Sequence, residues 1–103
     1  MDSSVFQLNG KVALITGASK GIGEAAARML ARQGARVVII SRKAEELKPV
    51  AESIAQAGGV CDFIAGNVGD TAFCTELVAE VVKRAGGLDI LVNNAATNPV
   101  YGP

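Results

Sequence analysis

Four short runs of apolar residues recur along the chain, at residues 12–15, 37–40, 61–65 and 88–92. They are rich in Val, Ile and Leu, and within each run the apolar residues are mostly continuous. Continuous runs of this length are typical of strands buried on both faces of a parallel sheet. Asp62 and Asp89 interrupt two of the runs, so the limits of those strands are defined less sharply.

The segments between the runs have apolar residues at helical spacing. In the first segment, one stripe would face the core, and Glu24 and Arg28 on the other side are spaced to form an i,i+4 ion pair. Gly34 is suited to the position just past the end of this helix. The stripe consists of Ile22, Ala25, Ala26, Met29 and Leu30.

The second and third segments differ in how clearly they begin. Pro49 would cost a helix interior about 3 kcal/mol, so we expect a turn over residues 43–47 and a regular helix from about Lys48. The third helix has a natural N-cap in Asp70, and Gly86 predicts its end. Its predicted buried face consists of Phe73, Leu77, Val78, Val81 and Val82.

Strands and helices therefore alternate along the chain, beginning and ending with a strand. With right-handed crossovers, this order predicts a three-layer α/β architecture with a parallel sheet between helices. A length of 103 residues suits one domain, and no repeat, low-complexity tract or linker divides the chain.

Composition and charge exclude several classes of protein. Half of the residues are apolar, 19% are charged and the net charge is zero, which is typical of a globular domain and argues against a nucleic-acid or acidic-membrane partner. We expect no signal peptide and no membrane span, because no apolar run approaches about 18 residues. Cys61 and Cys74 form no paired motif, which favours reduced thiols in a cytoplasmic protein over a disulfide. The chain has no histidine, the commonest zinc ligand, and we predict no metal site.

A glycine-rich loop, TGASKGIG at residues 16–23, joins the first apolar run to the first helix. Gly17 permits a tight turn after the strand, and Gly21 and Gly23 allow a bulky anion to approach the backbone at the first helical turn. The N–H groups there are unpaired and carry partial positive charge, so they bind phosphate. A strand before the loop and a helix after it favour dinucleotide binding over a simple turn.

The chain resembles the short-chain dehydrogenase/reductase family in this loop and in NNAA at residues 93–96. The family patterns are Thr-Gly-x-x-x-Gly-x-Gly after the first strand and Asn-Asn-Ala-Gly after the fourth, and the likeness extends over the whole chain. Within the family, the chain most resembles the oxoacyl-carrier-protein reductases. The resemblance implies a Rossmann-type sheet, of which residues 1–103 form the N-terminal, cofactor-binding part.

The resemblance also implies roles for single residues. The glycines of the loop would line the pyrophosphate of a nicotinamide cofactor and Ile22 would cover it, with Ser19 and Lys20 in the same loop. Asn67 and Val68 align with an Asp-Val pair that touches adenine in the family. Asparagine can meet the adenine edge because it both donates and accepts, although Asn67 is equally suited to a turn before Gly69.

In the second motif, the resemblance makes Asn93 structural, tying the fourth strand to the glycine loop. Asn94 and Ala95 would lie along the adenosine side of the cofactor. Ala96 stands where the family usually has glycine, and its methyl group would narrow the room near the nicotinamide ribose without abolishing binding.

The end of the second strand indicates which nicotinamide cofactor is bound. An acidic residue at this position would bind the ribose 2′-OH and repel a 2′-phosphate, but the chain has Ser41, followed by Arg42 and Lys43. With Lys20 in the glycine loop, these cations favour a 2′-phosphate and hence NADP(H). The alternative is that Arg42 and Lys43 form a solvated turn.

The catalytic residues of the family have no counterpart in the chain. The family uses a Tyr-x-x-x-Lys pair for proton transfer, but Tyr101, the one tyrosine, is followed by Gly102 and Pro103 and is interpreted as a loop residue. We therefore assign no catalytic residue. We expect the chain to be the cofactor-binding portion of an NADP(H)-dependent oxidoreductase of carbonyl or alcohol substrates. This portion alone is expected to be inactive.

Two other functions stay open: a non-catalytic dinucleotide-binding or regulatory module, and a structural domain whose glycines serve only turns. The two motifs together disfavour the structural domain. Residues 88–92 would form an unpaired apolar edge of the sheet, which recruits another chain. We therefore expect a homo-oligomer, or cover by the remainder of a longer protein.

Overall fold

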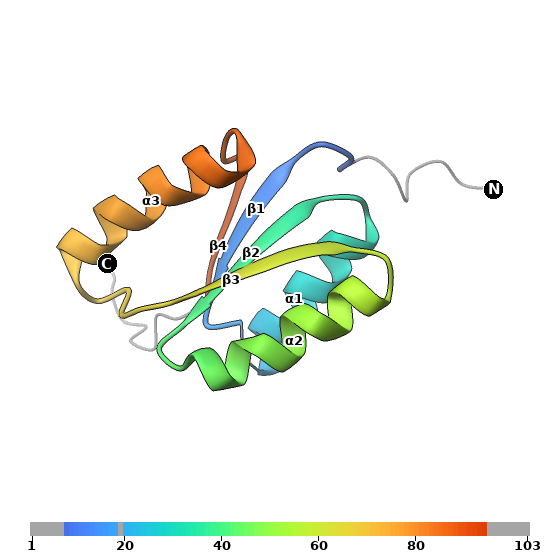
Figure 1. Ribbon diagram of the computed structural model, residues 1–103, viewed down its shortest axis with the longest axis horizontal. Coiled ribbons are helices and arrows are strands. Elements are labelled where there is room, and N and C mark those ends of the chain that lie inside the picture. Colours follow the sequence, from blue (N-terminus) through green and yellow to red (C-terminus); the bar gives the residue numbers. More distant parts are fainter. Residues whose placement is uncertain (1–7, 19, 95–103) are drawn as a thin grey trace, which may run out of the picture.

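The computed structural model describes residues 8–18 and 20–94. Strands and helices alternate along them in the order β1 (Val12–Thr16), α1 (Gly21–Arg32), β2 (Arg36–Ser41), α2 (Ala44–Gln56), β3 (Val60–Ala65), α3 (Thr71–Ala85) and β4 (Ile90–Asn93). The four strands are parallel and lie in the order β3-β2-β1-β4 (Figure 1). The predicted α/β fold with a parallel sheet is confirmed.

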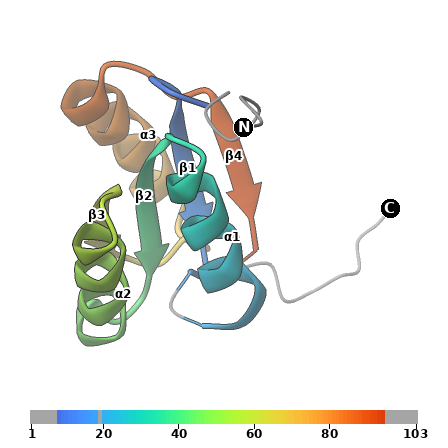
Figure 2. The same ribbon diagram turned by 90° about the vertical axis from the view of Figure 1, so that its right-hand side faces the viewer.

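The sheet is covered by helices on both faces. Helices α1 and α2 lie together on one face, and α3 lies on the other (Figure 2). Alternate residues of β1 pack into the two hydrophobic cores, one on each face of the sheet. Ala13 and Ile15 face α1 and α2, whereas Val12 and Leu14 face α3. The central strands β1 and β2 are therefore continuous apolar runs, as expected of a sheet with two covered faces.

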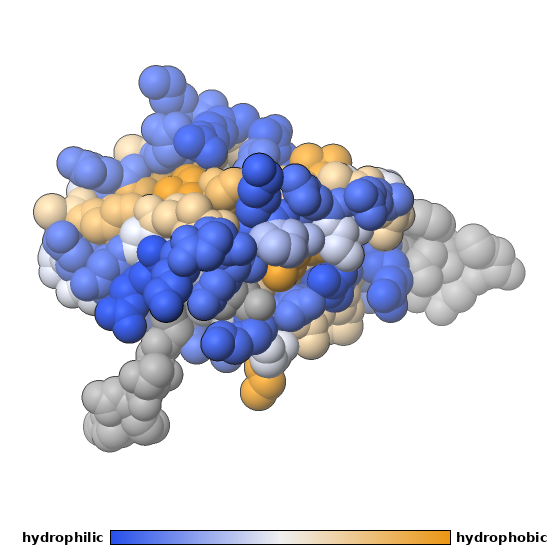
Figure 3. Space-filling view, turned by 60° about the horizontal axis from the view of Figure 1, so that its bottom comes forward, coloured by the Kyte–Doolittle hydropathy of each residue, from blue (hydrophilic) through white to orange (hydrophobic). Residues whose placement is uncertain are grey.

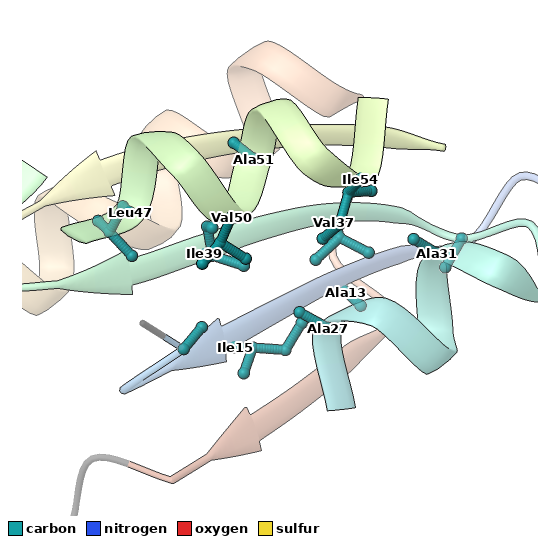
Figure 4. Packing of buried hydrophobic residues seen from close by; sticks show 12 residues of the cluster. Ala13, Ile15, Ala27, Ala31, Val37, Ile39, Leu47, Val50, Ala51 and Ile54 are labelled. Atoms are coloured by element: carbon teal, nitrogen blue, oxygen red, sulfur yellow. The ribbon is translucent and has the colours of Figure 1, made fainter. Parts of the chain in front are cut away.

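The buried face of α1 is not the stripe of larger apolar residues that the spacing predicted. The buried residues are Gly23, Ala27 and Ala31, whereas Ile22 is 76% exposed and Met29 is 54% exposed. The three buried residues are small and lie four positions apart, so the helix packs closely on β1 and β2 (Figure 4). The prediction was wrong for Ile22 and Met29, whereas Leu30 is partly buried against the same core. Close packing of the backbone, rather than side-chain size, selects the face of this helix.

Helix α2 begins at Ala44, so the predicted turn over residues 43–47 is wrong. Pro49 lies inside the helix on its exposed side and leaves the carbonyl of Glu45 without a helical partner. The helix continues because its other side packs on the sheet (Figure 4), and each buried Leu, Val or Ile contributes about 1.5–3 kcal/mol. This gain exceeds the cost of the proline. The buried residues are Leu47, Val50, Ala51 and Ile54.

Helix α3 has the limits that its capping residues predicted. The Asp70 carboxylate accepts from the N–H groups of Ala72 and Phe73, at 2.9 and 3.4 Å, and Gly86 ends the helix with a φ of 87°. Its buried face is narrower than predicted: Leu77 and Val81 are buried and Phe73 is half-buried, whereas Val78 and Val82 are 45% and 44% exposed.

The two predicted interruptions of strands have structural roles. Asp62 lies within β3 and forms an ion pair of 3.2 Å with Arg36 of the neighbouring strand. Asp89 precedes β4 and pairs with Val12 twice, because its carboxylate accepts from the Val12 N–H and its own N–H donates to the Val12 carbonyl, both at 2.9 Å. The fourth strand therefore begins at Ile90 rather than at Leu88.

Several large apolar side chains remain on the surface. The face in Figure 3 shows apolar patches within a largely hydrophilic surface. Within residues 8–18 and 20–94, no strand pairs with the outer edge of β4, where Leu91 is 61% exposed. The other exposed members of this group are Ile22, Met29, Val60, Val78 and Val82.

Candidate dinucleotide site

The glycine loop is held at the carboxyl ends of the two central strands. Gly17 leaves β1 with a φ of 65°, a conformation that glycine adopts without strain. The N–H groups of Gly17 and Ala18 both donate to the carbonyl of Ile40 in β2, at 2.8 and 3.3 Å. The loop is thereby fixed beside the end of β2, where parallel α/β sheets bind their ligands.

A close approach between Gly23 and Gly17 sets the position of α1 against the loop. A Cβ atom at Gly23 would collide with the Gly17 carbonyl oxygen and would lie 2.9 Å from Nδ2 of Asn94. Glycine at position 23 is therefore required by packing, and this requirement brings the first turn of α1 to the sheet edge. At Gly21, in contrast, the φ is 64° and a Cβ would meet nothing within 4 Å, so there is open space beside this turn.

The end of β4 is tied to the same loop. Asn94 donates through Nδ2 to the Gly17 carbonyl at 3.3 Å, and its backbone N–H donates to the Thr16 hydroxyl at 2.9 Å. Oγ1 of Thr16 lies 3.1 Å from Oδ1 of Asn93, to which it donates. Both asparagines take part in the tie expected of Asn93 alone, and the side chain of Asn94 lies on the glycine loop. Thr16, which sequence reasoning did not single out, is the centre of these contacts.

The N-terminus of α1 has the electrostatic character of an anion site. Its N-cap residue, Lys20, is exposed and makes no side-chain hydrogen bond to the first helical turn. The one carboxylate of that turn, Glu24, is bound by Arg28 at 3.0 Å to Nε and 2.7 Å to Nη2, as the spacing predicted. The first-turn amides and the positive end of the helix dipole are therefore available to bind an anion.

The predicted cationic positions lie at the end of β2. The hydroxyl of Ser41 accepts from the N–H of Lys43 at 3.3 Å, which fixes a turn through Arg42. Arg42 and Lys43 are exposed, and in the described part of the chain neither takes part in an ion pair. The β2 end therefore carries two cationic side chains and no carboxylate of its own.

The loop after β3 lies next to this position. The N–H of Gly66 donates to the carbonyl of Ser41 at 2.8 Å. In the same loop, Asn67 is exposed, and its Oδ1 accepts from the N–H of Gly69 at 2.8 Å, which makes it a turn residue. Val68 packs against the core beneath α3. Both predicted residues of this pair are thus brought to the same edge of the sheet as the glycine loop.

Four sequence-predicted positions, Ser19, Ala95, Ala96 and Tyr101, lie outside the described residues. Two hollows of the surface, of about 200 and 380 Å³, lie between the C-terminal halves of α1 and α2 and outside β3, away from the glycine loop. Neither hollow is lined by residues of the glycine loop, and a row of backbone amides binds phosphate without an enclosed cavity.

Other chemistry is not apparent in the described residues. Burial and, secondarily, the Asp62 charge raise the pKa of the Cys61 thiol from 9.0 to about 12, so this cysteine is no nucleophile at neutral pH. Residues 8–18 and 20–94 contain no cluster of three or more His, Cys, Asp and Glu residues suited to a metal ion. No helix in these ranges is long and apolar enough to cross a membrane.

Comparison with known proteins identifies the family of the chain. The family model of short chain dehydrogenases matches residues 11–101, and the chain belongs to this family. It is 47% identical over 90 residues to General stress protein 39 of Bacillus subtilis, covering 86% of this chain and 32% of that protein. It is 44% identical over 100 residues to Dehydrogenase/reductase SDR family member 4 of Homo sapiens, covering 92% of this chain and 34% of that protein.

Solved structures agree with the fold. A metagenomic short-chain oxidoreductase in complex with NADP superimposes with a TM-score of 0.85 and 41% identity, covering 93% of this chain and 43% of that one. The chain thus spans about a third of the length of the curated relatives named above. These relatives are short-chain dehydrogenases of several kinds, and they give no particular support to the narrower resemblance to oxoacyl-carrier-protein reductases.

Proposed function

We propose that the chain is the cofactor-binding portion of an NADP(H)-dependent oxidoreductase, which transfers hydride between the nicotinamide and a carbonyl or alcohol substrate. The observation that carries the proposal is the uncapped N-terminus of α1, with open space beside Gly21, next to a β2 end that carries Arg42 and Lys43. The residues present fit the cofactor, because these amides suit its diphosphate and the cations suit a 2′-phosphate. The nicotinamide supplies the hydride chemistry.

Selection of NADP(H) over NAD(H) is assigned to the β2 end. A guanidinium binds phosphate through two parallel hydrogen bonds, and Ser41 holds the turn that presents Arg42. A carboxylate at the same position would instead bind the 2′-OH of NAD(H). The NADP complex of the metagenomic oxidoreductase supports this cofactor by analogy.

Calorimetric titration of the chain with NADP⁺ and with NAD⁺ tests the proposal. We expect NADP⁺ to bind more tightly, and Arg42→Ala to weaken NADP⁺ binding by about tenfold or more while leaving NAD⁺ binding unchanged. Arg32→Ala is the matched control, because Arg32 is an exposed cation at the opposite end of α1. Equal or tighter binding of NAD⁺ by the unmodified chain would refute the choice of NADP(H).

The assigned reaction belongs to the longer polypeptide that the relatives represent, with its substrate bound outside the described residues. Two further parts of the proposal are a cytoplasmic location and the inactivity of this portion alone. NADPH-dependent turnover of a carbonyl substrate by the purified chain would contradict the latter. The alternative function, a non-catalytic dinucleotide-binding module, has the same binding properties. An activity assay of a protein of the relatives' full length distinguishes this module from the oxidoreductase.

A further inference from the structure

An ion pair near the start of α1 is held in place by a residue of the neighbouring helix. One carboxylate oxygen of Glu24 accepts from Nε of Arg28 at 3.0 Å and from its Nη2 at 2.7 Å. On its other side, the same guanidinium donates through Nη1 to the hydroxyl of Ser53 in α2 at 2.9 Å. The guanidinium is thus anchored both in its own helix and across the interface between α1 and α2, which fixes it against Glu24.

Glu24 is the acidic residue of the first turn of α1. The proposed function, on which this inference rests, assigns the amides of that turn to the diphosphate of the cofactor. Helical side chains lean toward the N-terminus of their helix, so an unpaired Glu24 carboxylate would lie toward these amides. It would take up the positive end of the helix dipole and repel a diphosphate. The side chains of Glu24 and Arg28 are 31% and 36% exposed, so solvent screens these charges incompletely.

We propose that Arg28 is a positioning residue for cofactor affinity, because it neutralises the Glu24 carboxylate and holds it on the side of α1 that faces α2. Arg28 lies about two turns into the helix and acts through Glu24 rather than by touching the cofactor. Loss of its charge would leave an unpaired carboxylate in the first turn, and the diphosphate would bind more weakly. Ser53 contributes by holding the guanidinium from the side of α2.

Calorimetric titration with NADP⁺ tests the inference on the unmodified chain, Arg28→Gln, Glu24→Gln and the double variant. We expect Arg28→Gln to weaken NADP⁺ binding by about three- to tenfold at low ionic strength, and Glu24→Gln to change it by less than about twofold. In the Glu24→Gln background, Arg28→Gln should have almost no further effect, because no carboxylate is left to neutralise. The weakening should diminish at about 0.5 M salt, which a purely structural role of Arg28 would not predict.

The ion pair between Glu80 and Arg84 in α3 provides a matched control, because it has the same i,i+4 spacing and an N–O distance of 2.7 Å. Both residues lie in the C-terminal half of α3, which leads into the start of β4 and is remote from the carboxyl edge of the sheet. Arg84→Gln should therefore leave NADP⁺ binding unchanged. Arg28→Lys keeps a positive charge four residues after Glu24 and should retain the affinity.

Circular dichroism verifies that each variant is folded, and Arg28→Ala, with its high helix propensity, replaces Arg28→Gln if the latter is not. Equal weakening by Arg28→Gln with and without the Glu24 carboxylate would show that Arg28 attracts the cofactor directly, and would overturn the inference. Unchanged binding by folded Arg28→Gln would overturn it as well. Both results leave the proposed function standing, whereas absence of NADP⁺ binding to the folded, unmodified chain would refute the proposed function itself.

Discussion

Gly23 lies so close to Gly17 that a Cβ atom on Gly23 would collide with the Gly17 carbonyl oxygen. The same carbonyl accepts from Nδ2 of Asn94. One backbone oxygen thus joins the glycine loop, the first turn of α1 and the residue after β4. The geometry of the proposed phosphate site depends on this contact, because it fixes where the amides of α1 point.

Gly23→Ala should destabilise the chain by about 1–3 kcal/mol, because the added methyl group must displace backbone rather than a flexible side chain. It should also weaken NADP⁺ binding. The free energy of unfolding is measured by urea denaturation. Gly87→Ala is the matched control, because a Cβ there meets nothing within 4 Å and is expected to leave stability and binding almost unchanged. Equal stability of the two variants would show that the Gly23 contact is not required.

Thr16→Val should cost about 1–3 kcal/mol of unfolding free energy, since it removes the hydroxyl that accepts from the Asn94 N–H within a buried residue. Valine keeps the shape of the side chain, so cavity formation adds little. Thr75→Val serves as comparison, because the Thr75 hydroxyl is exposed and donates to the Thr71 carbonyl within the same helix. The measurement is again urea denaturation, and an unchanged midpoint for Thr16→Val would argue against the tie.

Much of the fold follows from local signals. Strands β1 and β2 are continuous apolar runs, and α3 begins and ends at its Asp70 cap and Gly86. The buried face of α1 could not be predicted from local signals. Its apolar periodicity includes Ile22 and Met29, whereas the fully buried residues of the helix are small. The start of α2 was also missed, because tertiary packing of Leu47 outweighs the local penalty of Pro49.

The candidate site likewise has features that local sequence motifs predict and features that depend on the pairing of distant strands. The glycine loop and the cationic β2 end were predictable, because each is a short motif next to one strand. The contacts of Thr16 with Asn93 and Asn94 were not, since they require β4 to lie beside β1 in the register that pairs Thr16 with Asn93. The place of Asn67 before Gly69 suits it to a turn, but only the structure shows that its Oδ1 accepts from the Gly69 N–H.

The Cys61 thiol should stay protonated in the folded chain well above its ordinary pKa, because burial and the Asp62 charge raise that pKa to about 12. The unfolded chain releases this proton first, so the stabilising contribution is complete below about pH 9 and is lost as the pH rises toward about 12. Thiolate absorbance in a Cys74→Ser background measures the titration. A thiolate that appears near pH 9 while the chain is still folded would contradict this result.

The outer edge of β4 should drive self-association of the purified chain. The strand carries no charge, and Leu91 is 61% exposed, whereas β3 at the opposite edge contains Asp62. Leu91→Lys is therefore expected to reduce association in sedimentation velocity. Val60→Lys, at an exposed position of β3, should have much less effect. A compact monomer at high concentration of the unmodified chain would disprove the expectation.

We propose that the amides at the start of α1 bind the diphosphate of NADP(H). Nuclear magnetic resonance titration of the isotope-labelled chain with NADPH tests it residue by residue. We expect the largest amide shifts at Lys20, Gly21 and Ile22, with smaller ones at Arg42 and Lys43. Saturable shifts located elsewhere, or no shifts in a folded sample, would contradict it.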